Sequence, residues 1–123
     1  MSKKILIADD EENIRELVRI SLEDESFEIH EAVDGEDALA KAKELKPDLM
    51  VLDVMMPGKV GYEVCEELKS DPATKDIYIL FLSARGKNLT EITVKKKGGD
   101  EFMVKPFDPT ELRDKVMKAL NLE

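Results

Sequence analysis

Five short apolar runs recur along the chain, and each is followed by a stretch in which apolar residues keep helical spacing. Short apolar runs bounded by turn residues are typical of buried strands, whereas apolar residues three or four apart predict amphipathic helices. Strands that alternate with helices predict a parallel sheet covered by helices on both faces. The predicted strands are residues 4–8, 27–33, 49–53, 77–82 and 101–104.

The helical stretches differ in how strongly the sequence supports them. Asp34 and Asp108 are expected N-caps, and Pro109 suits a first helical position. The stretch Asn88–Lys97 has little apolar face and poor helix formers, so we expect it to be the least rigid helix. The other four helices have apolar faces formed by Ile14, Leu17, Val18 and Leu22; Ala38, Leu39, Ala42 and Leu45; Val64, Cys65 and Leu68; and Leu112, Val116, Ala119 and Leu120.

The complete pattern predicts a doubly wound α/β fold with a five-stranded parallel sheet and five helices. We expect residues 1–123 to form one domain, because 123 residues suffice for one hydrophobic core. Ligands bind beyond the carboxyl ends of the strands in such sheets, at the point where the strand order reverses. Polar residues at those ends are therefore the first candidates for a functional site.

Asp53 interrupts an otherwise apolar run that lies between Pro47 and Pro57. An unpaired carboxylate inside a buried strand would carry a desolvation cost. It should therefore lie at the strand end, facing a cleft, a cation or a hydrogen-bond donor. Taken alone, Asp53 is more simply explained as the first residue of a turn.

Other polar residues share the predicted rim with Asp53. Asp9 and Asp10 follow the first strand, Ser83 follows the fourth, and Lys105 ends the fifth. Each has a simpler explanation: acids favour a helix N-terminus, Ser83 could act as a cap, and Lys105 could be solvated. Their coincidence on one edge favours a common site.

Three carboxylates at one cleft repel one another and require a cation. An all-oxygen donor set that keeps water ligands suits Mg²⁺ better than Zn²⁺. A carboxylate beside Mg²⁺ can attack phosphorus in line and form an acyl phosphate. Lys105 would then neutralise charge on the phosphoryl oxygens, and the Ser83 hydroxyl would donate a hydrogen bond to one of them.

Composition narrows the classes of function. A formal net charge of −9 argues against nucleic acid or an anionic membrane as a partner. The run Lys95–Lys97 is explained by a solvated helix face. His30 is the only histidine and Cys65 the only cysteine of the sequence, so a transition-metal site is not favoured. The longest apolar run, residues 77–82, is far shorter than a membrane span. Residues 1–10 lack the length and the cleavage site of a signal peptide, so we do not expect one there. We expect a soluble, cytoplasmic protein.

The chain resembles, over its whole length, a receiver domain of a two-component response regulator of the single-domain, chemotaxis-receiver-like kind. The matching motifs are the pair Asp9–Asp10, the block Asp53–Pro57 with Gly61 eight residues after the aspartate, Ser83–Ala84, and Lys105–Phe107. The resemblance implies a flavodoxin-like fold with strand order 2-1-3-4-5, the order known for chemotaxis receivers.

The resemblance also implies a role for each matching residue. Asp53 would be the phosphoacceptor and a Mg²⁺ ligand, Asp10 a direct ligand, Asp9 a ligand through water, and the Met55 backbone carbonyl a further ligand. Lys105 and Ser83 would bind the phosphoryl group. The remaining implications are a switch pair formed by Ser83 and Phe102, a cis peptide at Lys105–Pro106, and tuning of the acyl phosphate lifetime by Met55 and Arg85.

Some positions depart from the commonest pattern of this family. Val60 stands where an acid or Asn often precedes the glycine, and Gly99 replaces a frequent alanine. Phe102 lacks the hydroxyl of the frequent tyrosine. These departures leave phosphoryl chemistry intact but remove one polar contact available to a partner.

The expected function is a phosphorylation-dependent signalling switch that catalyses only its own modification. A histidine kinase or phosphotransfer protein would supply the phosphoryl group. An unidentified protein would bind a surface on the fourth helix, fifth strand and fifth helix. The switch would be a monomer or a phosphorylation-dependent dimer. One alternative is an aspartyl-nucleophile phosphatase, which is disfavoured because Met55 stands where such enzymes usually carry a second aspartate. Another is an adaptor of the same fold that works without phosphorylation.

Overall fold

A five-stranded parallel sheet forms the centre of the computed structural model, which describes residues 2–24, 26–84, 95–96 and 98–122. The sheet order is β2-β1-β3-β4-β5, so the predicted order 2-1-3-4-5 is confirmed. All four strand pairs are parallel. The strands are β1 (Lys3–Ala8), β2 (Phe27–Ala32), β3 (Leu49–Asp53), β4 (Tyr78–Ala84) and β5 (Glu101–Lys105).

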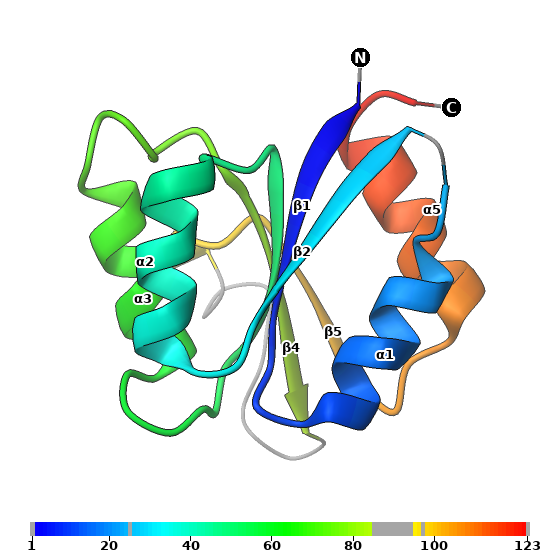
Figure 1. Ribbon diagram of the computed structural model, residues 1–123, viewed down its shortest axis with the longest axis horizontal. Coiled ribbons are helices and arrows are strands. Elements are labelled where there is room, and N and C mark those ends of the chain that lie inside the picture. Colours follow the sequence, from blue (N-terminus) through cyan, green and yellow to red (C-terminus); the bar gives the residue numbers. More distant parts are fainter. Residues whose placement is uncertain (1, 25, 85–94, 97, 123) are drawn as a thin grey trace.

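Helices cover both faces of this sheet, as predicted for a doubly wound fold (Figure 1). Helices α2 and α3 lie on one side, and α1 and α5 lie on the other. The predicted N-caps are confirmed: Asp34 accepts a hydrogen bond from the Asp37 N–H, and Asp108 accepts one from the Thr110 N–H. The helices are α1 (Glu12–Ser21), α2 (Gly35–Leu45), α3 (Gly61–Lys69) and α5 (Pro109–Ala119).

Strand β3 separates two hydrophobic clusters, and all five of its residues are buried. Successive side chains of a strand point to opposite faces. Met50 and Leu52 accordingly pack in the cluster beneath α2 and α3, while Leu49 and Val51 pack in the cluster beneath α1 and α5. The strand that carries Asp53 is thus held from both sides.

Several predicted boundaries need correction. Strand β2 ends at Ala32, and Val33 is 49% exposed. Strand β4 begins at Tyr78 and extends to Ala84, so Ser83 lies within it rather than after it. Leu17, predicted on the apolar face of the first helix, is 38% exposed because the buried stripe of α1 centres on Val18.

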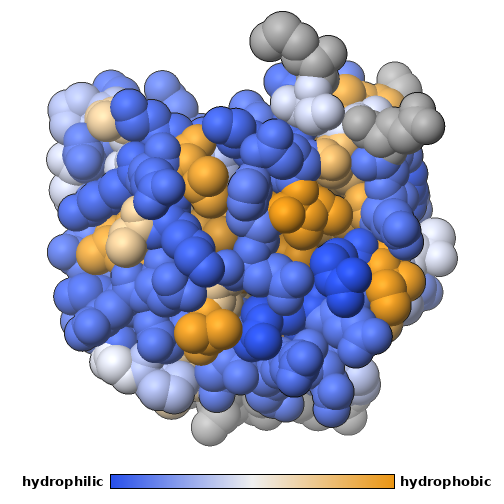
Figure 2. Space-filling view, in the orientation of Figure 1, coloured by the Kyte–Doolittle hydropathy of each residue, from blue (hydrophilic) through white to orange (hydrophobic). Residues whose placement is uncertain are grey.

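The predicted fourth helix, Asn88–Lys97, lies mainly outside the described residues. Its two described residues, Lys95 and Lys96, are helical. Arg85 also lies outside them. Within the described part of the chain, no helix is both long and apolar enough to cross a membrane. The face seen in Figure 2 is mostly hydrophilic, with separate apolar patches.

Two glycines, Gly58 before α3 and Gly61 at its first position, differ in what surrounds them. A Cβ on Gly61 would lie 2.3 Å from the Asp53 carbonyl oxygen and 2.9 Å from the Val54 Cα. The Gly61 N–H also donates to the Val54 carbonyl at 2.8 Å. A Cβ on Gly58 would meet only Glu36 Cγ, at an ordinary contact distance of 3.9 Å, but this residue has a φ of +78°. Helix α3 can therefore approach the end of β3 only with glycine at position 61.

We predict that Gly61→Ala lowers the free energy of unfolding by about 2–3 kcal/mol, because a methyl group would collide with rigid backbone. Gly58→Ala is the matched control, with an expected loss of about 1 kcal/mol from its left-handed conformation alone. Urea unfolding followed by circular dichroism measures both values. Equal losses in the two variants would contradict the close approach.

Candidate functional site

Four strands bring the predicted site residues to one rim of the sheet, at the lower edge of the view in Figure 1. Asp9 and Asp10 directly follow β1, and Asp53 is the last residue of β3. Ser83 lies near the end of β4, and Lys105 is the last residue of β5. The parallel topology thus gathers residues that are up to 96 positions apart, as the difference between 105 and 9 gives.

The three aspartates form a compact acidic cluster. One carboxylate oxygen from each of Asp9, Asp10 and Asp53 lies within 4.8 Å of the others. Asp9 is fully buried, Asp53 is 4% exposed, and Asp10 is exposed. The cluster therefore opens to solvent on the side of Asp10.

Lys105 brings a positive charge to this cluster. Its Nζ lies 2.8 Å from Asp9 Oδ2, 3.5 Å from Asp53 Oδ1 and 3.9 Å from Glu11 Oε1. Burial disfavours the ammonium, but contact with Asp9 and the negative charges of Asp53, Asp9 and Glu11 outweigh it and raise the pKa of Lys105. The lysine stays protonated and can neutralise an incoming anion.

Asp53 is an unusually weak acid in this environment. Burial is the largest cause, and the charge of Asp9 adds to it, so the pKa of Asp53 rises to about 6. Lys105 and the Met55 N–H, which donates to Asp53 Oδ1 at 3.3 Å, act in the opposite direction. The protein thus retains a reactive carboxylate at neutral pH but destabilises its charge.

The acidic cluster fits a hard divalent cation. Within the described part of the chain, Asp9 Oδ2 is fully buried and accepts no hydrogen bond of regular geometry, although Lys105 lies beside it. Carboxylate oxygens that face partly open space suit Mg²⁺, which keeps several water ligands. Asp9, Asp10 and Asp53 are the residues that would hold such an ion.

Ser83 and Met55 lie near this acidic cluster, whereas Phe102 lies near the start of β5, at the other end of the strand from Lys105. Ser83 is buried, with 1% exposure, one position beyond Leu82, the β4 residue that pairs with Asp53. The Met55 side chain is 55% exposed at the rim. Phe102 is partly buried against the cluster beneath α2 and α3. The Lys105–Pro106 peptide bond is cis, the isomer that the resemblance implied.

Arg15 belongs to this neighbourhood although the sequence analysis did not single it out. Its guanidinium donates to the Asp9 carbonyl oxygen at 2.8 Å and to Glu31 Oε1 at 3.1 Å. A signal was present in the sequence: Arg15 lies three positions before Val18, on the buried stripe of α1. A charged residue in such a stripe indicates a buried polar partner.

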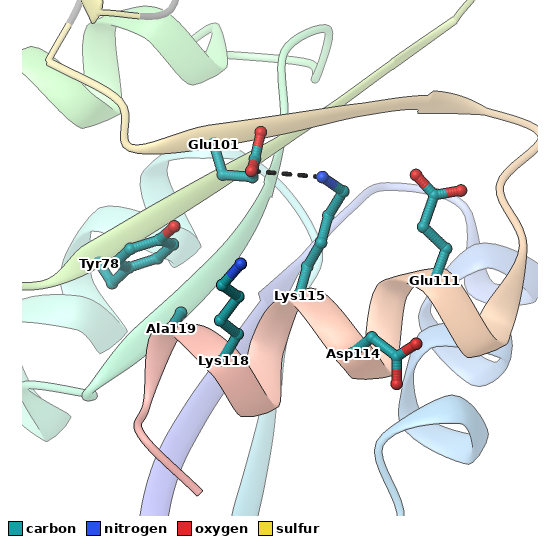
Figure 3. A pocket seen from close by; sticks show the side chains of 7 residues that line it. All are labelled: Tyr78, Glu101, Glu111, Asp114, Lys115, Lys118 and Ala119. Atoms are coloured by element: carbon teal, nitrogen blue, oxygen red, sulfur yellow. Dashed lines mark hydrogen bonds and ion pairs between the residues drawn. The ribbon is translucent and has the colours of Figure 1, made fainter. Parts of the chain in front are cut away.

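A separate charged groove lies away from the acidic cluster, between α5 and the amino-terminal ends of β4 and β5 (Figure 3). Lys115 Nζ lies 3.3 Å from Glu101 Oε2 across it. The groove exposes carboxylates and ammonium groups side by side. Its lining is Tyr78, Glu101, Glu111, Asp114, Lys115, Lys118 and Ala119.

Residues 5–117 match the family model of the response regulator receiver domain. The chain therefore belongs to the receiver domain family of two-component response regulators. It is similar to the "Alkaline phosphatase synthesis transcriptional regulatory protein PhoP" of Bacillus subtilis, with 42% identity over 120 residues. It is also similar to the "Phosphate regulon transcriptional regulatory protein PhoB" of Pseudomonas aeruginosa, with 42% identity over 112 residues.

These matches cover 98% and 91% of this chain but only 49% of each relative, so the chain spans about half the length of the curated relatives it matches. Among solved structures, the chemotaxis response regulator CheY4 of Vibrio cholerae has a TM-score of 0.87 and 31% identity, covering 97% of this chain and 99% of that one. The BeF3-activated DrrB receiver domain has a TM-score of 0.87 and 29% identity, covering 98% and 99%. The described backbone is therefore similar to that of known receiver domains.

The burial of Asp53 predicts a stability change in Asp53→Asn. The pKa of Asp53 is about 6 in the folded state, against an ordinary value of 3.8. Between these two pH values the folded state binds more protons at Asp53 than the unfolded state does. Ionisation of Asp53 therefore destabilises the fold as the pH rises. In EDTA at pH 8, the neutral Asn should raise the free energy of unfolding by about 1–2 kcal/mol. The gain should shrink as the pH falls through 6 towards 4.

Urea unfolding at a series of pH values tests this expectation. Asp76→Asn, a change at an exposed aspartate, is the control and should show no such gain. A lower stability of Asp53→Asn than of the wild type at pH 8 would contradict the assigned environment.

Proposed function

We propose that this chain is a phosphorylation-dependent switch in which Asp53 accepts a phosphoryl group from a histidine kinase or phosphotransfer protein. The observation that carries the proposal is the position of Asp53: a nearly buried carboxylate with Lys105 Nζ at 3.5 Å, beside Asp9 and Asp10. Membership of the receiver family supports the same chemistry.

The proposed reaction is an in-line transfer. An oxygen of the Asp53 carboxylate forms a bond to phosphorus while the phosphorus–nitrogen bond of a donor phosphohistidine breaks. Mg²⁺, when bound, supplies charge neutralisation for the phosphoryl oxygens. Lys105 would pair with a phosphoryl oxygen; the position of its ammonium near both Asp9 and Asp53 supports this role. Its pairing with Asp9 keeps the ammonium in place before transfer.

The proposed roles of the remaining residues follow the family pattern. The Met55 carbonyl would complete the cation ligands, Ser83 would donate its hydroxyl to the phosphoryl group, and Phe102 would change its packing in response. Met55 and Arg85 would tune the lifetime of the acyl phosphate. A local change of charge would thus bias the packing of β4 and β5.

The proposed output surface comprises the fourth helix, β5 and α5. Its described part includes the groove of Figure 3, whose charged side chains suit a protein partner with complementary charges. The unidentified output could be another protein or a second copy of this chain. The net charge of −9 supports protein rather than nucleic acid as the partner of this chain itself, and the proposal implies a cytoplasmic location.

Two alternative functions are less favoured than this switch. A phosphatase with an aspartyl nucleophile is not favoured, since Met55 stands two residues after Asp53. An adaptor that works without phosphorylation is not favoured, since Asp9, Asp53 and Lys105 retain close mutual contact. The switch would catalyse only its own phosphorylation and dephosphorylation.

Incubation with Mg²⁺ and acetyl phosphate tests the acceptor. We expect intact-mass spectrometry to show one added phosphoryl group in the wild type and in Asp76→Ala, and none in Asp53→Ala. An unmodified wild type, or a modification that survives Asp53→Ala, contradicts the proposal. Sustained hydrolysis of an unrelated phosphate ester would favour the phosphatase.

Lys105→Ala separates phosphorylation from the response to it. Without the ammonium, the phosphoryl group should still transfer, but roughly 100-fold more slowly, because one preorganised positive group is missing. The modified variant should leave the amide signals of β5 and α5 unshifted in two-dimensional NMR spectra. Lys43→Ala, at an exposed lysine of α2, should respond as the wild type does. Shifts of wild-type size in Lys105→Ala would contradict this role.

A further inference from the structure

Arg15 links helix α1 to the acidic cluster through the protein backbone. Its side chain is 13% exposed, so the guanidinium is largely withdrawn from water. It donates to the Asp9 carbonyl oxygen at 2.8 Å and, through Nε, to Glu31 Oε1 at 3.1 Å. Glu31 lies on β2, in register with Ile7 of β1. The guanidinium therefore bridges an edge strand and the residue that follows β1.

Two further polar groups of Asp9, its N–H and Oδ1, also form hydrogen bonds. Its N–H donates to the Ala32 carbonyl at 3.2 Å, and its Oδ1 accepts from the Glu11 N–H at 2.9 Å. With Arg15 on the carbonyl, Oδ2 is the only polar atom of Asp9 that lacks a hydrogen bond of regular geometry within the described residues. These three bonds fix both the backbone and the carboxylate plane, and they leave Oδ2 directed at the cluster.

Water cannot readily replace the hydrogen bond that Arg15 donates to the Asp9 carbonyl. Asp9 is fully buried, so water does not reach its carbonyl freely, and an unpaired buried carbonyl is costly. Rotation of the peptide between Asp9 and Asp10 would relieve that cost by turning the carbonyl towards solvent. The same rotation would move the Asp10 carboxylate and Asp9 Oδ2 relative to Asp53.

We propose that Arg15 is a positioning residue for the cation site: by holding the Asp9 carbonyl it sets the orientation of the Asp9 and Asp10 carboxylates. This inference rests on the proposed binding of Mg²⁺ by Asp9, Asp10 and Asp53. Residues that orient metal ligands in this way affect metal affinity without touching the ion.

The direction in which Mg²⁺ affinity changes when Arg15 is replaced distinguishes positioning from simple electrostatics. Arg15 is itself a cation near a cation site, so its charge alone would weaken Mg²⁺ binding, and its removal would strengthen it. Positioning predicts the opposite result. Arg19 provides a matched control, because its Nε pairs with Glu31 Oε2 at 3.4 Å from the same helix, whereas its side chain is 49% exposed. No described contact joins it to the Asp9 carbonyl.

Isothermal titration calorimetry with MgCl₂ tests the proposal on the wild type, Arg15→Met and Arg19→Met. Both variants lose one positive charge and one ion pair with Glu31, and Met keeps most of the aliphatic stem. We expect Arg15→Met to weaken Mg²⁺ binding roughly tenfold. Arg19→Met should stay within about twofold of the wild type. In EDTA, the amide signals of Asp10 and Glu11 should shift only in Arg15→Met.

An Arg15→Met affinity equal to or higher than that of the wild type overturns the proposal. If Arg15→Met does not fold, Arg15→Lys replaces it: a single ammonium cannot serve both acceptors as the guanidinium does, so Mg²⁺ affinity should fall several-fold. Unchanged affinity in the folded Arg15→Lys would also overturn it. A wild type that does not bind Mg²⁺ contradicts the proposed function instead, and so the two failures are distinguishable.

Discussion

The structure depends on carboxylates held together where water is scarce. Asp9 is fully buried and Asp53 nearly so, and their charges repel across a short distance. Lys105 offsets part of that repulsion, yet the pKa of Asp53 still rises to about 6. The site therefore carries stored electrostatic cost that a cation or an incoming phosphoryl group can alter. In the proposed switch, this cost is what would couple a change of charge to a change of packing.

The scaffold makes this arrangement rigid on one side. Strand β3 packs into a hydrophobic cluster on each face, and the close approach of Gly61 to its last carbonyl fixes where α3 begins. The Asp9 side is held differently, through hydrogen bonds to Ala32, Glu11 and Arg15. Hydrophobic packing positions Asp53, whereas polar contacts position Asp9. The two halves of the site can therefore respond differently to substitution.

Strand β5 connects the acidic cluster to the groove of Figure 3. Lys105 ends β5, and Glu101 at the start of the same strand lines that groove and pairs with Lys115 of α5. A five-residue strand thus carries a site residue at one end and a surface charge at the other. Phe102, next to Glu101, is only partly buried against the cluster beneath α2 and α3.

The sequence alone determined the alternation of strands and helices, the N-caps at Asp34 and Asp108, and the set of polar residues at the strand ends, because these features follow from local spacing and apolar runs. The strand order was available only through resemblance to a family. Tertiary structure decided that Ser83 lies inside β4, that Leu17 is partly exposed, and that Arg15 holds the Asp9 carbonyl. These depend on which elements pack together and on how far water is excluded, which no local pattern of residues encodes.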